Sequence, residues 1–183
     1  MTARADAQRN RAKLLAVAGA AFASTDGTAA TLEGIAREAG VGIGTLYRHF
    51  PTREALVEAV YAAELDDVVS SATALLAELP PEAALRAWMD RYAAFHATKR
   101  GMGETLRAGW ASGAIATPAT RERITAAIAA ILEKGAAAGT LRADIDPENV
   151  TVMLLGVFLS TAAIDTPEKI GPILDLVVDA LRA

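Results

Sequence analysis

The stretch TLEGIAREAGVGIGTLYRHFP, residues 31–51, contains two short segments of helical periodicity separated by a glycine. Thr31 is a preferred helix N-cap residue, and Gly40 interrupts the first segment because glycine readily takes the left-handed conformation that ends a helix. A second helix is predicted over about 42–49. It should end at Phe50, because the residue before Pro51 is pushed out of helical geometry. The sequence therefore predicts two short helices joined by a tight turn.

These two helices have the spacing of a helix-turn-helix. Ala36 is a small residue where the helices touch, Gly40 turns the chain, and Leu46 anchors the second helix. In the second helix, Ile43, Leu46 and Phe50 are expected to share the inward stripe. The other side of that helix is then left for the major groove of a DNA duplex.

The outer side of the second helix combines glycines with an aromatic and basic cluster. Gly42 and Gly44 cost helix stability but let the backbone lie close to DNA. Arg48 has the forked donor geometry that suits a guanine edge, whereas hydroxyl and imidazole groups can donate to phosphates. A purely structural alternative for Tyr47 is that it covers the junction with the next helix. The predicted DNA-binding residues are Thr31, Gly42, Gly44, Thr45, Tyr47, Arg48, His49 and Arg53.

The rest of the chain is punctuated by helix caps, prolines and glycines, so we predict an all-α fold. A three-helix DNA-binding domain over residues 1–51 would precede a helical ligand-binding and dimerisation domain over residues 52–183. About nine helices are expected, at roughly 9–24, 32–39, 42–49, 52–78, 82–98, 102–112, 118–138, 147–164 and 167–182.

The first helix has an alternative interpretation. Its basic start and short apolar stretch imitate a secretory signal, but Leu15, Ala18 and Phe22 also fall on one helical stripe, and we favour a buried amphipathic helix. The basic residues near the N-terminus would form either an arm that touches DNA or a solvated tail. These residues are Arg4, Arg9 and Arg11.

Composition limits the classes of function. The chain has 183 residues, no cysteine and two histidines far apart, so disulfides, a zinc site and a cysteine nucleophile are not expected. The sequence contains no recognisable catalytic set or cofactor motif. Residues 1–53 carry a net charge of +3 within a total of −4, which suits a modest DNA-binding head on an acidic body. The alternatives are an enzyme with an appended DNA-binding head and a scaffold protein that binds DNA without sequence preference.

Two predictions concern the ligand-binding and dimerisation domain, residues 52–183. The run Val150–Ile164 is apolar nearly all round and too short to cross a membrane, so with the last helix it predicts a homodimer through residues 147–182. The alternative is that both helices pack only within the monomer. Large side chains concentrate between Ala84 and Trp110, where we expect an apolar small-molecule effector. A histidine on an otherwise apolar helix, such as His96, is more often a core residue than a ligand-binding group. The candidate effector residues are Trp88, Tyr92, His96, Met102 and Trp110.

Residues 31–61, TLEGIAREAGVGIGTLYRHFPTREALVEAVY, resemble the DNA-binding segment of the TetR family of bacterial transcriptional regulators. The motif GTLYRHF followed by a basic residue and EAL carries the resemblance, which covers about the first third of the chain. It implies an all-α cytoplasmic homodimer that represses promoters at palindromic operators and releases DNA when a small molecule binds. Many relatives carry serine or threonine and lysine near positions 42 and 43, so their phosphate contact is not carried over to Gly42 and Ile43.

Overall fold

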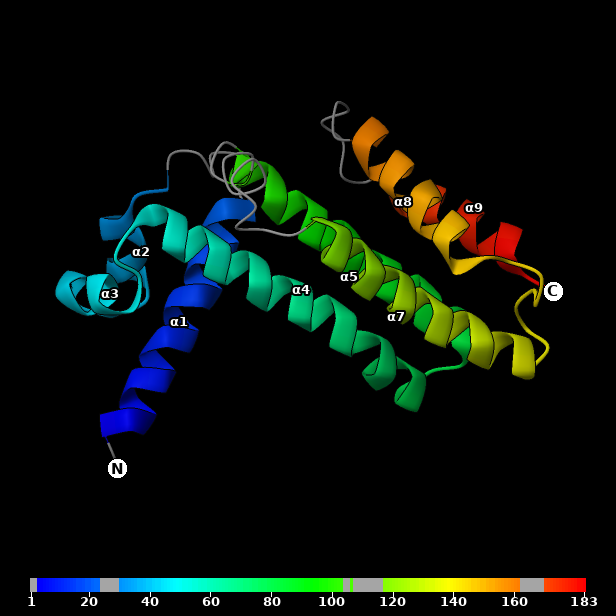
Figure 1. Cartoon of the computed structure of the whole chain (residues 1–183), viewed down its shortest axis with the longest axis horizontal. Helices are drawn as coiled ribbons and strands as arrows, with labels where there is room; N and C mark the ends of the chain where they lie inside the picture. The colour runs from blue at the N-terminus through cyan, green and yellow to red at the C-terminus, as the bar shows by residue number, and fades with distance from the viewer. Residues whose placement is uncertain (1–2, 24–29, 104–105, 107–116, 162–169) are drawn as a thin grey trace. The chain divides into compact units, whose positions relative to one another are not determined.

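The computed structural model describes residues 3–23, 30–103, 106, 117–161 and 170–183, and these residues form eight helices and no strand (Figure 1). The all-α prediction is confirmed. Most of the helix expected over 102–112 lies outside the described residues. The helices are α1 (Ala3–Ala23), α2 (Leu32–Glu38), α3 (Ile43–His49), α4 (Arg53–Glu78), α5 (Pro81–Gly101), α7 (Thr117–Ala137), α8 (Pro147–Thr161) and α9 (Ile170–Leu181).

The contacts divide the chain into two compact units. The first comprises Met1–Leu65 and Phe95–Ala116, and the second comprises Asp66–Ala94 and Thr117–Ala183. Helices α4 and α5 therefore contribute residues to both units. The domain boundary expected after residue 51 stays a prediction.

In the first unit, α1, α2 and α3 pack against one another (Figure 1). The buried stripe of α1 consists of Leu14, Ala18 and Phe22, each fully buried. The stripe expected from the sequence started at Leu15, which is only half-buried, whereas its neighbour Leu14 is fully buried. The interpretation of this segment as a buried amphipathic helix is supported.

The turn between α2 and α3 is a Schellman motif. Gly40 has φ 65°, and its N–H donates to the Arg37 carbonyl oxygen at 3.1 Å, while the Val41 N–H donates to the Ala36 carbonyl oxygen at 2.9 Å. Both bonds satisfy carbonyl groups that the end of α2 would otherwise leave unpaired. Val41 and Ala36 are both buried, which is the apolar contact that usually accompanies this motif.

In the second unit, α7 packs against α8, and the start of α8 has the predicted cap (Figure 1). The Glu148 N–H donates to a carboxylate oxygen of Asp146 at 2.9 Å, and Pro147 takes the first helical position, where its missing N–H costs nothing. The C-terminus is tied to this unit by a bond from the Arg142 N–H to the Leu181 carbonyl oxygen at 2.9 Å. Pro172 lies in the first turn of α9, where proline is tolerated.

The apolar residues of α8 do not all enter the core of the chain. Val150, Leu154 and Phe158 are buried, whereas Val152 and Leu159 are 50% and 73% exposed. Over the part of the chain that the structure describes, no helix is both long enough and apolar enough to cross a membrane.

Candidate nucleic-acid interface

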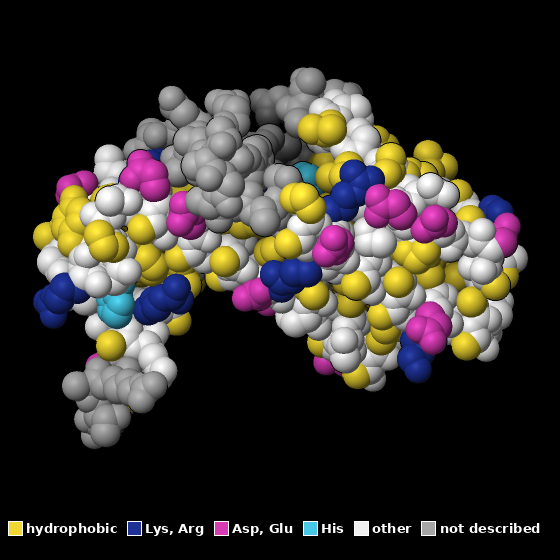
Figure 2. All heavy atoms as spheres, viewed as in Figure 1, with side chains coloured by type: hydrophobic (Ala, Val, Ile, Leu, Met, Phe, Trp, Pro, Cys, Tyr) yellow, Lys and Arg dark blue, Asp and Glu magenta, His cyan; other side chains and the backbone are white. Residues whose placement is uncertain are grey.

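One side of α3 is open to the surroundings. Leu46 and Phe50 are buried, whereas Tyr47 is 44% exposed and Arg48 is exposed. Thr45 and His49 are half-buried. Beside α3, Figure 2 shows basic side chains and a histidine side chain together at the surface. The sequence prediction of an inward Leu46 and an outward Tyr47 and Arg48 is therefore confirmed.

The prediction that Ile43 faces inward is wrong. Ile43 is 39% exposed, although it is the first residue of α3 and shares a helical spacing with buried Leu46 and Phe50. Val41 is buried immediately before the helix, because the turn at Gly40 directs it into the core. Val41 therefore fills the apolar position at this end of α3, and Ile43 is left outside.

The guanidinium of Arg48 is held along its own helix. Its Nε donates to the Gly44 carbonyl oxygen at 3.1 Å, and one terminal nitrogen lies 3.3 Å from the Thr45 hydroxyl oxygen, to which it donates. These bonds restrict the rotamers of a long side chain before any partner arrives, which lowers the entropy lost on binding. Arg48 and Thr45 thus form one polar patch on the exposed side of α3.

The two glycines of α3 are not required by the fold of the free chain. A Cβ atom added at Gly42 or Gly44 would meet nothing within 4 Å, and neither residue has positive φ. Gly42 is the N-cap of α3, where glycine is well tolerated. Gly44 lies inside the helix, where glycine costs roughly 0.5–1 kcal/mol relative to alanine. Nothing in the described part of the chain requires a glycine at position 44.

Two of the predicted DNA-binding residues have structural roles in the DNA-binding head. The Thr31 hydroxyl accepts the Gly34 N–H at 3.1 Å and so caps α2, as the sequence predicted. The Arg53 guanidinium donates to the Ala30 carbonyl oxygen and lies 5.3 Å from the centroid of the Phe22 ring. Arg53 therefore fastens the start of α4 to α1 and to the segment before α2. Its contact with a phosphate stays a prediction.

The basic N-terminal residues form part of α1 rather than an extended arm or tail, since the helix begins at Ala3. Arg9 pairs with Asp6 on the helix surface, and the Arg11 guanidinium lies 5.4 Å from the centroid of the Phe50 ring. Nothing is described of the Arg4 side chain. Any contact of this segment with DNA would come from one face of a helix.

The candidate effector residues fall in different parts of the chain. Trp88 and Tyr92 belong to the second unit, His96 and Met102 belong to the first, and Trp110 lies outside the described residues. Trp88, Tyr92 and Met102 are buried, and His96 is half-buried. Their role in binding an effector stays a prediction.

In the second unit, Trp88 and Tyr92 pack as core residues. The indole N–H of Trp88 donates to the Val68 carbonyl oxygen at 3.0 Å. The Trp88 and Tyr92 ring centroids lie 5.2 Å apart, and Tyr92 meets Phe158 edge to face, also at 5.2 Å. A small molecule that used these two side chains would have to displace packing of this kind.

Sequence reasoning missed Lys99 in the first unit. Its ammonium nitrogen lies 5.5 Å from the Tyr61 ring centroid and 4.9 Å from the Phe95 ring centroid. Burial lowers the pKa of this ammonium to about 8. The spacing of Phe95 and Lys99, four residues apart on one helix, was the available signal, since such residues are neighbours on a helix surface.

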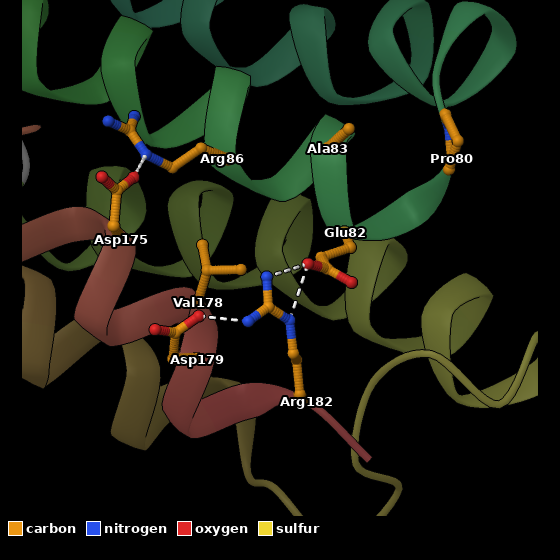
Figure 3. A pocket seen from close by; sticks show the side chains of 8 residues that line it. All are labelled: Pro80, Glu82, Ala83, Arg86, Asp175, Val178, Asp179 and Arg182. Carbon is orange, nitrogen blue, oxygen red and sulfur yellow. Dashed lines mark hydrogen bonds and ion pairs between the residues drawn. The ribbon is translucent and has the colours of Figure 1, made fainter.

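A surface groove of about 380 Å³ in the second unit lies between α5 and α9 (Figure 3). Arg86 pairs with Asp90 and Asp175 at 2.5 Å each, and Arg182 pairs with Glu82 and Asp179. Each arginine in Figure 3 is thus occupied by carboxylates of the same chain. We therefore interpret the groove as the line of contact between α5 and α9, where ion pairs join the two helices, and not as a ligand site. Its lining residues are Pro80, Glu82, Ala83, Arg86, Asp175, Val178, Asp179 and Arg182.

Comparisons with known proteins match both parts of the chain. Residues 14–60 match the family model described as bacterial regulatory proteins, tetR family, and residues 80–183 match the model of the C-terminal domain of SbtR-like transcriptional regulators. The solved structure of the TetR transcriptional regulator SCO0520 from Streptomyces coelicolor is 45% identical, with a TM-score of 0.85 over 94% of this chain and 98% of that one. A TetR transcription regulatory protein from Mycobacterium vanbaalenii is 32% identical, with a TM-score of 0.77 over the whole of both chains. A comparison with curated proteins gave no match.

The packing of Arg53 leads to a prediction about stability in the absence of DNA. Replacing Arg53→Ala removes the bond to the Ala30 carbonyl and the contact with the Phe22 ring, so the free energy of unfolding should fall by about 1–2 kcal/mol. Urea denaturation followed by circular dichroism measures this change. Arg37→Ala is the matched control, because Arg37 is exposed on α2 and should change the free energy by less than ~0.5 kcal/mol. Equal effects of the two substitutions would contradict a structural role for Arg53.

Proposed function

Because the chain belongs to the TetR family and is a DNA-binding transcriptional regulator, we propose that it is a repressor that binds a palindromic operator as a homodimer and leaves it when a small molecule binds. Within this proposal α3 is the recognition helix and enters the major groove. The protein would act in the cytoplasm, where its operator is accessible, and would catalyse no reaction.

The observation that supports this use of α3 most directly is the open position at Gly44. The free chain has room for a side chain there, and alanine would favour the helix, so glycine is a disadvantage for folding alone. Close approach of a helix backbone to a DNA duplex supplies the missing reason, because a Cβ atom at this position would stand between the helix and the groove.

The other side chains divide into two roles. Arg48 and Thr45 would contact base edges, since their shared patch projects from the exposed side of α3. Tyr47 and His49 would donate to phosphates, which fixes the position of the head without reading sequence. Thr31 and Arg53 lie at the starts of α2 and α4, and we assign them to the backbone of the duplex. Gly42 gives the same close approach as Gly44 at the N-terminus of α3.

The dimer would form through residues 147–182, and the exposed apolar side chains of α8 and α9 support this proposal. Leu159 is 73% exposed and Leu176 is 67% exposed, which is unusual for two leucines in one compact unit. Gly156 has nothing within 4 Å of an added Cβ and would let a second copy come close. Figure 2 shows hydrophobic side chains at the surface over α8. The exposed apolar residues are Val152, Met153, Leu159 and Leu176.

The effector would act by changing the spacing of the two recognition helices. Each must sit about one DNA turn, ~34–36 Å, from its mate to read a palindrome. A ligand that binds better to a form with another spacing must lower the affinity for DNA. Trp88, Tyr92 and His96 recur every four residues along α5 and share one face of it, and with Met102 and Trp110 they remain our candidates for contacting an apolar effector.

Two alternatives have less support. An enzyme with a DNA-binding head would need a catalytic or metal site, and in the described part of the chain no group of three or more His, Cys, Asp or Glu could hold a metal ion. A scaffold protein that ignores DNA sequence would depend on phosphate contacts alone, so base substitutions in the bound DNA would leave its affinity unchanged.

The first test of the proposal is the substitution Gly44→Ala. It should raise the free energy of unfolding by about 0.5–1 kcal/mol and lower operator affinity by roughly tenfold, or ~1.4 kcal/mol. Thermal denaturation and fluorescence anisotropy with a selected operator duplex measure the two effects. Gly40→Ala is the control, since its positive φ should make the same substitution cost about 1–2 kcal/mol of stability. Unchanged operator affinity of Gly44→Ala would remove the close approach of α3 from the proposal.

The dimer interface is tested at its most exposed positions. Leu159→Glu and Leu176→Glu should each convert the dimer to a folded monomer, because a carboxylate would be buried against the second copy while the core of the monomer is untouched. Sedimentation velocity measures the oligomeric state, and circular dichroism checks the fold. Ala130→Glu adds the same charge at an exposed position of α7 and should leave the dimer intact. If both leucine variants remain dimeric, the interface lies elsewhere.

The response to a small molecule is tested by reciprocity. A compound found by thermal-shift screening should bind about 5–150-fold more weakly when the protein is saturated with operator DNA, because coupling between two sites acts equally in both directions. Isothermal titration with and without the operator duplex measures the ratio. A second duplex of the same length and scrambled sequence is the control. Equal affinities with and without operator would exclude that compound as an inducer.

A further inference from the structure

Ile43 is an exposed apolar side chain at the start of the recognition helix. It is the first residue of α3 and is 39% exposed, and the apolar position at this end of the helix is already filled by buried Val41. Its neighbours Gly42 and Gly44 carry no side chain, and both positions are open. Ile43 therefore presents part of its side chain at the surface on the first turn of α3, with Tyr47 one turn further along the same face.

The chemistry of Ile43 limits what it can contact in a DNA complex. Its side chain has neither a donor nor an acceptor, so it cannot bind a phosphate or pair with the polar groups of a base. In the major groove, the apolar group on a base edge is the C5-methyl of thymine. In a helix-turn-helix, the N-terminal residues of the second helix are the ones that contact base edges.

From this position and chemistry we propose that Ile43 is a specificity-determining residue that packs against the methyl group of one thymine in each operator half-site. The inference rests on the proposed function, since it requires α3 to lie in the major groove. A β-branched side chain on a helix has one strongly preferred rotamer, so Ile43 presents its methyl groups at a fixed position. It reads an A·T pair at one position by apolar contact, whereas Arg48 and Thr45 read other positions by hydrogen bonds.

The test removes single methyl groups from the DNA. An operator is first selected with the full-length dimer from random duplexes, and each thymine of a half-site, with its symmetry mate, is then replaced by deoxyuridine, which lacks only the C5-methyl. Fluorescence anisotropy measures the affinity of wild type, Ile43→Ala and Ile43→Val for every duplex. Circular dichroism checks that both variants remain folded.

At one thymine position, wild type should lose about fourfold in affinity per half-site, the effect expected for one buried methyl group. Ile43→Val keeps an apolar β-branched side chain and should keep most of this sensitivity, whereas Ile43→Ala should bind the thymine and deoxyuridine duplexes equally well. A structural role of Ile43 would instead weaken binding to all duplexes alike.

Two results would overturn the inference in distinguishable ways. In the first, wild type selects an operator, but each thymine-to-deoxyuridine replacement changes its affinity and that of Ile43→Ala by the same factor. In that case Ile43 does not read a methyl group, and the regulator function stands. If wild type selects no sequence at all, the proposed function fails and the inference fails with it.

Discussion

The left-handed turn at Gly40 is the constraint on which the DNA-binding head depends. Positive φ at this residue allows the N–H groups of Gly40 and Val41 to bond back to the end of α2, and it sends the Val41 side chain into the core. Helix α3 can then begin at Ile43 with Leu46 and Phe50 buried. Every other feature of the interface, including the exposed Tyr47 and Arg48, follows from this placement of α3 on α2.

The head uses several of its cations to hold itself together. Arg53 binds the Ala30 carbonyl and covers the Phe22 ring, and Arg11 covers the Phe50 ring. Arg9 is paired with Asp6. These contacts do not change the net charge of +3 for residues 1–53, but they hold three guanidinium groups against the protein. Arg48 differs from these residues, since its contacts lie within the exposed side of α3 and hold its guanidinium there.

The second unit has a different balance between core and surface. Its aromatic residues Trp88, Tyr92 and Phe158 form a continuous packed cluster, and ion pairs attach α9 to α5. Each of these pairs has one side chain that is more than half exposed, Asp175 in one and Arg182 in the other, so solvent screens the pair and its contribution to stability is small. Apolar packing stabilises the unit more than these pairs do. Leucines remain outside on α8 and α9 because each helix has more apolar residues than one buried face can accommodate.

The sequence by itself determined the helices and the motif. Caps, glycines and the Phe50-Pro51 pair are local signals, so the all-α fold, the Thr31 cap and the turn at Gly40 could be predicted from neighbouring residues alone. The signature around Tyr47 and Arg48 also identifies the family without any knowledge of the tertiary structure. Periodicity was less reliable, because it indicates which residues share a helical face and does not indicate what that face meets.

Only the tertiary structure decided which side chains are buried or take part in contacts within the chain and which remain exposed. Ile43 has the spacing of the buried residues of α3 but is 39% exposed, whereas Val41, which precedes the helix, is buried. In the sequence Arg53 is one basic residue among several. It becomes a structural residue only because the Phe22 ring of α1 and the Ala30 carbonyl lie beside its guanidinium in the folded chain. The physical reason is the same in both cases: burial depends on the space that the packed chain leaves at each position, and a local pattern of periodicity contains no information about that space.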